Sequence, residues 1–373
     1  MIHPASGWIL LDKPRGMGST QAVGAVKRVL RQGGYPKTKV GHGGTLDPLA
    51  EGVLPIALGE ATKLAGRMLD SDKIYAFTIA FGEETDTLDT EGEVVRTSDR
   101  RPPMAAVAAV LEHFTGEIDQ APPKYSALMI DGKRAYDRAR AGEEVEMKTR
   151  RVTVHDLFLP GTGRGIIDED DGGGAPSAKS TANGPDVPVA PLHHPADGPP
   201  PRAGEELTSA FATTLGRPDP YDPQAPLELA DSVTLVAHVS KGTYIRSLAR
   251  DIAHALGTVG HVTYLRRIKA GPFREEQAIS LDTLEEIAKG APLEHLLLPL
   301  EAGLDDIPVL PLDPTSAQAV RQGRVLSELS PVSKRWADGL HLAKSGDVPI
   351  ALMELRGGTA KVVRGFNLPD VAE

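Results

Sequence analysis

A low-complexity stretch near the middle of the chain limits most strongly what the protein can fold into. Residues 161–230 contain 10 Gly and 12 Pro, with an acidic run at 168–171 and Gly and Pro tracts at 172–174 and 199–201. A segment of this composition cannot bury enough apolar surface to offset the entropy lost on ordering. We therefore predict a disordered insertion, with the ordered protein built from the residues on either side.

The rest of the composition suits a protein with more than one folded domain. The chain has 373 residues, of which 40% are hydrophobic, enough for a substantial core. It has no cysteine, which excludes disulfides, thiolate metal sites and a cysteine nucleophile. The sequence shows no secretion signal and no apolar run of membrane-spanning length, so we expect a cytoplasmic protein that does not interact with a membrane.

The net charge of −10 hides two basic segments. Residues 161–230 carry 4 Lys/Arg and 11 Asp/Glu, and so account for most of the negative charge. Residues 13–39 carry 7 Lys/Arg and no acid, and residues 241–274 carry 7 Lys/Arg against one Asp. Clustered positive charge suits phosphate recognition, although each segment alone also fits a solvated helix face.

Residues 41–52, GHGGTLDPLAEG, place one carboxylate, Asp47, in a loop of small residues. The glycines let a ligand approach the main chain closely, and Pro48 restricts the backbone of Asp47 and so the direction of its carboxylate. A Gly-rich turn with a solvated Asp explains the same residues. The loop alone leaves both interpretations open.

Hydrophobic periodicity predicts strands at 8–12, 73–81 and 232–239 and two amphipathic helices. One helix would begin with Ser19 as its N-cap and end at the Gly pair 33–34, and the other would be capped by Thr243 and end at Gly257. Arg246 falls in the first turn of the second helix, where a cation opposes the helix dipole. A nearby carboxylate would offset this conflict, which marks Arg246 as a candidate functional residue.

Several segments in this order resemble the motif series of bacterial tRNA pseudouridine-55 synthases, the TruB family. They are DKPRGMGS, GHGGTLDPLAEGVLPIALGEATK, DKIYAFTIAFGEETDTLDTEG, PPKYSALMIDGKRAYDRARAGEEVE, SKGTYIRSLARDIAHALG and HVTYLRRIKAGPF. The resemblance covers nearly all of residues 7–160 and 231–300. The sequence departs from the family at Gly43–Gly44, where many relatives have Thr or Ala before the second Gly, and in the insertion.

The resemblance implies an α+β fold with a mixed, mainly antiparallel central sheet of the pseudouridine-synthase type, flanked by helices. Residues 1–304 would form the catalytic domain, interrupted by the insertion at 161–230. Residues 305–373, with short strand patterns and one helix at about 316–326, would form a small β-rich, PUA-like RNA-binding domain. Residues 124–150 would form a mobile thumb that closes over the RNA loop.

The implied reaction detaches the uridine at position 55 of the tRNA T-loop from its sugar, rotates it and rejoins it through carbon 5. Asp47 would be the nucleophile, attacking either the ribose or the base, and Arg246 would pair with it and keep it ionised. Tyr75 would stack on the base and help to remove the carbon 5 proton. Leu265 would form an apolar wall of the pocket, and Tyr244 would contact the substrate.

Binding of the T-arm of tRNA would require the target base to be flipped out, and His42 would enter the space left behind. The family needs no cofactor or metal, and we expect a monomer without an obligate protein partner. The candidate phosphate contacts are Lys13, Arg15, Lys27, Arg28, Lys63, Arg250, Arg266, Arg267 and Lys269, with Lys361 and Arg364 near the C-terminus.

Two other classes of function fit parts of the sequence. A nucleoside hydrolase or glycosidase could use Asp47 as the nucleophile and Glu51 as the acid, since glycosidic cleavage often needs two carboxylates. A non-catalytic RNA chaperone would need the basic segments but not Asp47.

Overall fold

The computed structural model describes most of the chain on both sides of the predicted insertion. The described residues are 5–126, 128–130, 132–141, 143, 147–160, 228–327 and 336–368. Nearly all of the predicted insertion lies outside them, so its disorder remains a prediction, and the predicted thumb is described only in part. No helix in the described ranges is long and apolar enough to cross a membrane.

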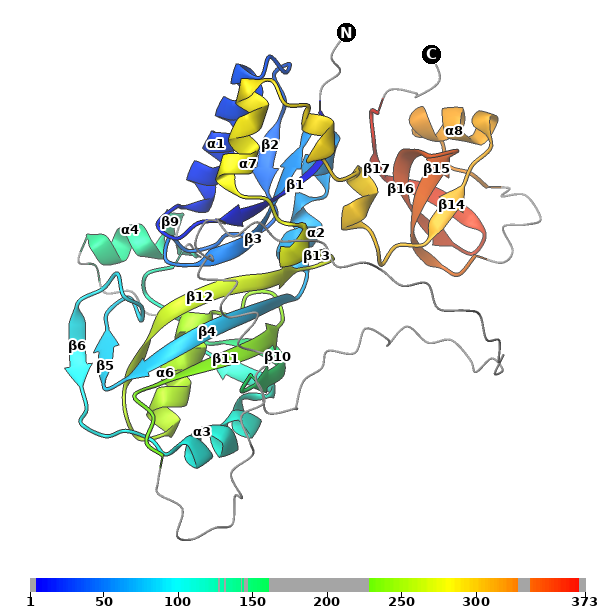
Figure 1. Ribbon diagram of the computed structural model, residues 1–373. Helices are drawn as coiled ribbons and strands as arrows, with labels where there is room; N and C mark the ends of the chain where they lie inside the picture. Colours follow the sequence, from blue (N-terminus) through cyan, green and yellow to red (C-terminus); the bar gives the residue numbers. More distant parts are fainter. Residues whose placement is uncertain are drawn as a thin grey trace, which may run out of the picture. The chain divides into compact units, whose positions relative to one another are not determined.

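A large mixed sheet forms the centre of the fold, as predicted (Figure 1). The main strand order is β1 (Gly7–Lys13), β3 (Glu51–Leu58), β12 (Gly260–Ala270), β4 (Lys73–Phe81), β11 (Ser232–Val239), β10 (Arg150–Phe158), β7 (Gly116–Gln120). Strand β3 runs parallel to β12, whereas β1–β3, β12–β4, β4–β11 and β10–β7 are antiparallel pairs. Two short strands, β2 (Val40–His42) and β13 (Phe273–Arg274), pair with β3 and β12.

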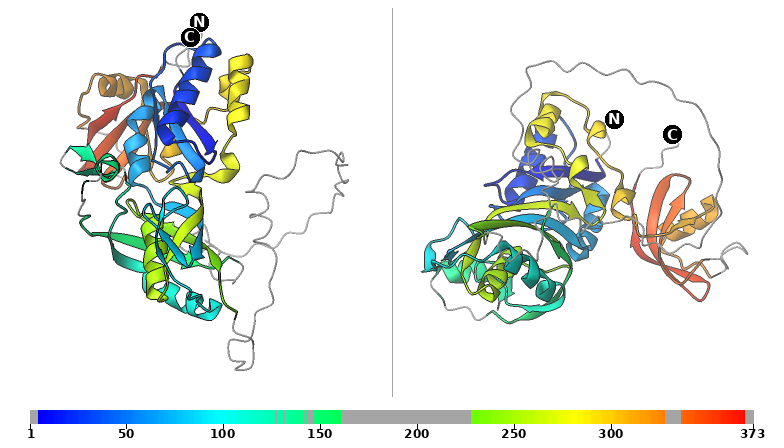
Figure 2. Two further views of the ribbon diagram at one scale, coloured as in Figure 1. Left: turned by 90° about the vertical axis from the view of Figure 1, so that its left-hand side faces the viewer. Right: turned by 60° about the horizontal axis from the view of Figure 1, so that its bottom comes forward.

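Two longer helices cover this sheet, α1 (Ser19–Gln32) and α6 (Ile245–Ala255). Both helices are amphipathic, as predicted: the apolar residues Ala22, Val23, Val26, Val29 and Leu30 of α1 are buried, as are Ile245, Leu248, Ala249 and Ile252 of α6. Helix α1 lies beside α7 (Leu281–Glu285), which is far from it in sequence (Figures 1 and 2). The smaller elements are α2 (Ala65–Asp70), α3 (Met104–Val110), α4 (Ala135–Arg140) and the hairpins β5 (Glu83–Thr85) with β6 (Val94–Thr97) and β8 (Met129–Ile130) with β9 (Lys133–Arg134).

Both predicted N-caps are wrong, whereas the predicted end of α1 at Gly33 is confirmed. The N-cap of α1 is Gly18, because the hydroxyl of Ser19 instead accepts from the Leu46 N–H at 2.8 Å and donates to the Leu46 carbonyl at 3.0 Å. The N-cap of α6 is Tyr244, and the Thr243 hydroxyl donates to the Ser240 carbonyl at 2.9 Å. Each hydroxyl has a better partner outside its helix.

The C-terminal residues form a second, four-stranded sheet with one helix. The order is β14 (Val309–Pro311), β15 (Gly339–Ser345), β16 (Val348–Arg356) and β17 (Thr359–Gly365), with β14 and β15 parallel. Helix α8 (Pro314–Arg321) starts earlier than predicted because Asp313 caps it, and strand β15 was not predicted. The domain boundary at 304/305 remains a prediction, because the described residues on both sides of it belong to one compact unit.

Trp8 lies at the centre of a buried cluster that joins the two sheets. Its ring is fully buried, packs 5.2 Å from the Phe273 ring and donates from Nε1 to the Leu300 carbonyl at 3.1 Å. The same cluster contains Leu342 of β15 and Phe366, which follows β17. Strand β1 is therefore packed against residues of the C-terminal sheet and the segment that follows it.

We predict that Trp8→Ala lowers the free energy of unfolding by about 3–5 kcal/mol, because the cavity left by a buried aromatic ring is not refilled. Urea denaturation followed by circular dichroism measures this change. Leu69→Ala, at a side chain that is 50% exposed, is the control, and its effect should stay below about 0.5 kcal/mol. Equal losses in the two variants would contradict a central role for Trp8.

Candidate active site

The loop that carries Asp47 connects β2, which ends at His42, to β3, which begins at Glu51. Two of its glycines are required by their surroundings. A Cβ on Gly43 would lie 2.7 Å from the Met68 Cβ, and Gly52, at φ 97°, would direct one into the backbone of Arg267. The loop is therefore packed closely against its neighbours.

Two buried cations, Lys13 and Arg267, bind backbone carbonyls of this loop and of the segments beside it. Lys13 is fully buried, and its ammonium donates to the carbonyls of Pro14 at 3.0 Å, Met17 at 2.7 Å and Pro48 at 3.5 Å. Arg267 is 1% exposed and donates to the Val53 carbonyl at 2.7 Å. It also reaches the carbonyls of Gly44 and Thr45, both at 3.4 Å.

These contacts correct part of the predicted phosphate-binding set. Lys13 and Arg267 are inside the protein, and their donors are used by the backbone around Asp47. Arg266 is also engaged: its guanidinium binds Asp12 at 3.1 Å and Glu275 at 2.7 Å and lies 3.5 Å from Glu51. Three of the predicted phosphate contacts are thus structural, because buried charges need partners within the protein.

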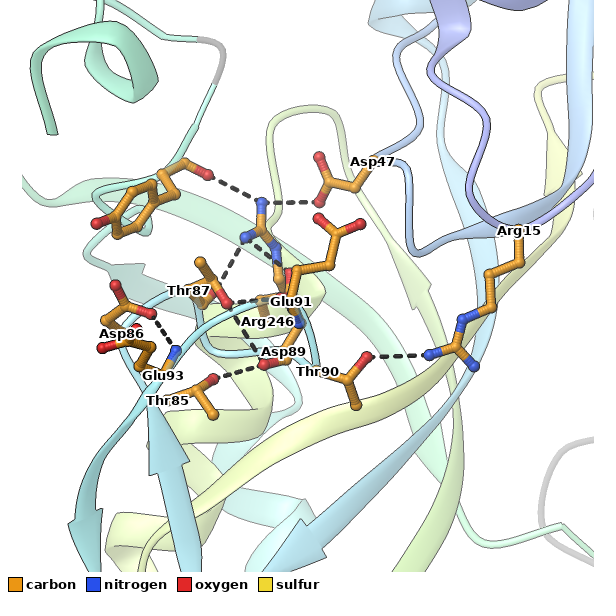
Figure 3. A network of polar contacts seen from close by, with 11 residues as sticks. Arg15, Asp47, Thr85, Asp86, Thr87, Asp89, Thr90, Glu91, Glu93 and Arg246 are labelled. Carbon is orange, nitrogen blue, oxygen red and sulfur yellow. Dashed lines mark hydrogen bonds and ion pairs between the residues drawn. The ribbon is translucent and has the colours of Figure 1, made fainter. Parts of the chain in front are cut away.

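Arg246 binds Asp47 directly (Figure 3). Its Nη2 lies 2.8 Å from Asp47 Oδ2, and its Nη1 lies 3.1 Å from Asp89 Oδ2. The guanidinium also donates to the carbonyls of Thr87 at 2.8 Å and Tyr125 at 3.0 Å. The Arg246 side chain is 5% exposed, Asp89 2% and Asp47 34%, so Asp47 is the member of the group that substrate can reach.

The second carboxylate, Asp89, is itself held by its loop. Its Oδ1 accepts from the Thr87 hydroxyl at 2.6 Å and from the Glu91 N–H at 3.0 Å. Leu88, just before it, has the positive φ of 65° that is uncommon for a residue with a side chain. The two carboxylates offset the cation at the start of α6, which accounts for the residue that seemed misplaced in the sequence.

Tyr75 and Leu265 lie on the sheet face beneath the loop. In the register of β4 and β12, Arg267 is opposite Tyr75 and Leu265 is opposite Phe77, so these four side chains share one face. Arg267 reaches the Gly44–Thr45 backbone from this face. Tyr75 is half-buried and Leu265 is 5% exposed. The structure therefore brings both residues to the face that the loop of Asp47 covers.

The other predicted substrate contacts, His42, Tyr244 and Lys63, lie in three different environments. His42 is half-buried at the end of β2, where burial, and then the charge of Arg267, lower the pKa of its imidazole. Tyr244 immediately precedes α6, and its ring packs 4.8 Å under the guanidinium of Arg150. Lys63 instead donates to Glu60 at 2.6 Å and to the Gly365 carbonyl at 2.9 Å, so an RNA contact from Lys63 remains a prediction.

Comparison with known proteins agrees with this geometry. Residues 27–163 match the model of the TruB family pseudouridylate synthase N-terminal domain, and residues 246–305 match the tRNA pseudouridylate synthase B C-terminal domain. The chain belongs to the TruB family. It is a pseudouridine synthase, and therefore an isomerase.

Relatives support the same assignment over nearly the full length, and a solved structure shares the fold. Proteins named tRNA pseudouridine synthase B are 57% identical in Novosphingobium aromaticivorans, covering 98% of this chain and 99% of that protein, and 49% identical in Zymomonas mobilis, covering 97% and 96%. A chain in the structure of an H/ACA RNP bound to a substrate RNA containing 2′-deoxyuridine shares the fold, with a TM-score of 0.59 and 21% identity. That match covers 98% of this chain and 86% of the other.

Sequence reasoning missed two residues that contribute to the TruB site. Asp89 lies in a loop with several other acids. The dipole conflict at Arg246 predicted a nearby carboxylate but did not identify which acid supplies it. Gln120 is fully buried, and its Oε1 accepts from the N–H of Tyr244 at 2.8 Å, so a side chain from β7 caps α6. No local pattern connects it to a helix 124 residues away.

We predict that Asp89→Asn lowers the single-turnover rate of pseudouridine formation by about 10²-fold. Loss of one charged partner would let the Arg246 guanidinium shift, and a displacement of about 1 Å at a reacting group can cost this much. RNA affinity, measured by filter binding, should change little. Glu93→Gln in the same loop is the control, and an unchanged rate in a folded Asp89→Asn protein would contradict the prediction.

Lys13 gives the fold a predictable pH dependence. Burial lowers the pKa of its ammonium from 10.5 to about 8, and the Asp47 carboxylate opposes the shift. At a pH between about 8 and 10.5, Lys13 binds more protons in the unfolded chain than in the folded one. The contribution of Lys13 to the free energy of unfolding therefore rises with pH across this window and is lost as the pH falls towards 8. The difference in unfolding free energy between wild type and Lys13→Met should shift in favour of wild type as the pH rises. Urea titrations at several pH values test this, with the exposed Lys27→Met showing no such trend.

Proposed function

We propose that this enzyme isomerises the uridine at position 55 in the T-loop of tRNA, with Asp47 as the nucleophile. One observation carries the proposal: a partly exposed carboxylate is fixed by a buried guanidinium that a second carboxylate also holds. The guanidinium fixes the direction of this carboxylate, as attack on a bound ribose or base requires. The relatives named tRNA pseudouridine synthase B support tRNA as the substrate.

The reaction needs attack, rotation and proton removal within one pocket. The Asp47 carboxylate bonds to the ribose or to the base, the bond from the sugar to nitrogen 1 breaks, and the uracil turns. Carbon 5 then bonds to the sugar, and the bond to Asp47 breaks, which returns the free carboxylate. The carbon 5 proton is then lost and nitrogen 1 gains one, so substrate and product are isomers. Tyr75 stacks on the base and helps to take up this proton, directly or through a relay. Leu265 keeps the pocket apolar and limits attack by water, which would release free uracil.

A base within a folded RNA arm must leave its stack to reach Asp47, at a cost of a few kcal/mol. We assign His42, at the edge of the same loop, to the space that the base leaves. Tyr244, next to Arg246, contacts the substrate. The enzyme acts as a monomer in the cytoplasm, without an obligate partner.

We place the RNA backbone along exposed cations in the residues that follow β1, namely Arg15 and Arg28. Arg15 is exposed and donates to the Thr90 hydroxyl at 2.9 Å, one residue beyond Asp89. Arg15 and Arg28 line one open groove between α1 and α7. The backbone N–H of Gly16, beside Arg15, donates to the Pro48 carbonyl at 2.7 Å, which links this groove to the loop of Asp47.

We assign residues 1–304 to catalysis and residues 305–373 to a PUA-like RNA-binding domain. Lys361 and Arg364 are exposed on β17 and could contact phosphates there.

The position of Glu51 weighs against a glycosidase. Glu51 pairs with Arg266 in the parallel register of β3 and β12, whereas the next residue, Arg267, points to the face of Tyr75. Successive strand residues point to opposite faces, so Glu51 lies on the other side of the sheet from the pocket. Its charge is used by Arg266 at 3.5 Å.

An assay with tRNA transcript labelled with tritium at carbon 5 of uridine tests the proposal. Wild-type enzyme should release tritium without free uracil, and release should fall to background with Asp47→Asn, which removes the nucleophilic charge. A transcript with cytidine at position 55 should release none above background.

The outcomes separate the three classes of function. Free uracil would show a hydrolase, and equal activity of wild type and Asp47→Asn would remove Asp47 from the mechanism. Tight binding of tRNA by both proteins, with no tritium release by either, would identify an RNA chaperone. Release from the position-55 cytidine transcript would place the target elsewhere in the tRNA.

A further inference from the structure

Two histidines and an aspartate meet on the sheet face opposite the active site. His238 of β11 pairs with Ile74 of β4, whereas its neighbour Ala237 pairs with Tyr75, so His238 points away from the side of Tyr75. His155 of β10 lies beside it, with ring centroids 4.7 Å apart. The third residue, Asp72, immediately precedes β4.

The strand register brings the two imidazoles together. The Ser240 N–H donates to the Thr153 carbonyl at 2.8 Å. His155 lies two residues after Thr153 in β10, and His238 of β11 lies two residues before Ser240; their rings are in contact. Strands β10 and β11 are neighbours in the sheet, and the contact between the two rings places both histidines on the same face. Cross-strand partners on one face have Cβ atoms about 4.5–5.5 Å apart, a separation fixed by the backbone.

The donor atoms have the spacing of a small metal site. One ligand atom from each of Asp72, His155 and His238 lies within 4.8 Å of the other two. His155 Nε2 is 3.2 Å from Asp72 Oδ2. Tetrahedral Zn²⁺ with bonds of about 2.0–2.2 Å separates its ligand atoms by about 3.4 Å, which a small side-chain rotation would give here.

We propose that Asp72, His155 and His238 form a binding site for a divalent transition-metal ion, with Zn²⁺ as the preferred occupant. Two imidazole nitrogens and one carboxylate oxygen are a donor set that suits Zn²⁺ and excludes Mg²⁺, which prefers oxygen ligands. A water molecule completes the tetrahedron. The metal cross-links β10, β11 and the start of β4, and stabilises the two strands between which the insertion departs.

The charges around the group favour a cation. Asp156 Oδ2 lies 3.6 Å from His238 Nδ1 and can orient that ring or serve as a further ligand. The nearby ammonium of Lys241 is balanced by Asp70 at 3.0 Å.

Calorimetric titration of the full, untagged chain with ZnCl₂ tests this site. We expect one Zn²⁺ bound per chain and no competition from excess Mg²⁺. Titration with Co²⁺ should produce the intense visible bands of a tetrahedral site. His155→Ala and His238→Ala should each weaken binding by about tenfold or more, since each removes one of three protein donors.

Two controls locate the metal. His113→Ala removes an exposed histidine elsewhere and should leave binding unchanged. The double variant His193→Ala, His194→Ala removes the His pair outside the described residues and should also bind normally. Absence of saturable Zn²⁺ binding, or loss of binding in the His193/His194 variant but not in His155→Ala, would overturn the proposal. All of these variants should keep the wild-type rate of pseudouridine formation, so the result does not depend on the catalytic assignment.

Discussion

The buried guanidinium of Arg246 is the interaction on which the site depends. Removing a charge of this size from water costs several kcal/mol unless partners surround it, and the protein supplies two carboxylates and two carbonyls. These partners come from the Asp47 loop, the loop after β5 and the segment after β7. The cation therefore ties three separate segments to the start of α6, and the Asp47 carboxylate is positioned when these segments dock.

Much of the positive charge around this centre acts inside the protein rather than on RNA. Lys13 and Arg267 donate to backbone carbonyls of the Asp47 loop, and Arg266 balances acids on the opposite face. Glycines that allow the loop to pack closely also leave main-chain carbonyls that need donors, and long basic side chains reach them from the sheet below. A count of cations in the sequence consequently overestimates the surface available to phosphate.

The sequence predicted the helices and strands well, but it predicted the contacts between residues far apart in the chain poorly. Alternation in β4 and the apolar stripe of α1 follow from local periodicity, so both elements were found. The caps failed because Ser19 and Thr243 bond to residues outside their helices, and β15 was missed because GLHLAKS has too little alternation. Asp47 and Arg246 were found through the motif and the dipole conflict. Asp89, Gln120 and the Asp72–His155–His238 group depend on register and on contacts across the chain, which no local pattern records.

Arg266 and Arg267 are neighbours in β12 but serve opposite sides of one sheet, one in an acid cluster and the other beneath the Asp47 loop. The pleat of the strand is what separates their roles. A one-residue insertion or deletion within β12 would exchange the two sides, leaving an arginine without acids and acids without an arginine. Length variation among natural or engineered versions of this enzyme should therefore be tolerated in the connections around β12 and strongly selected against within it.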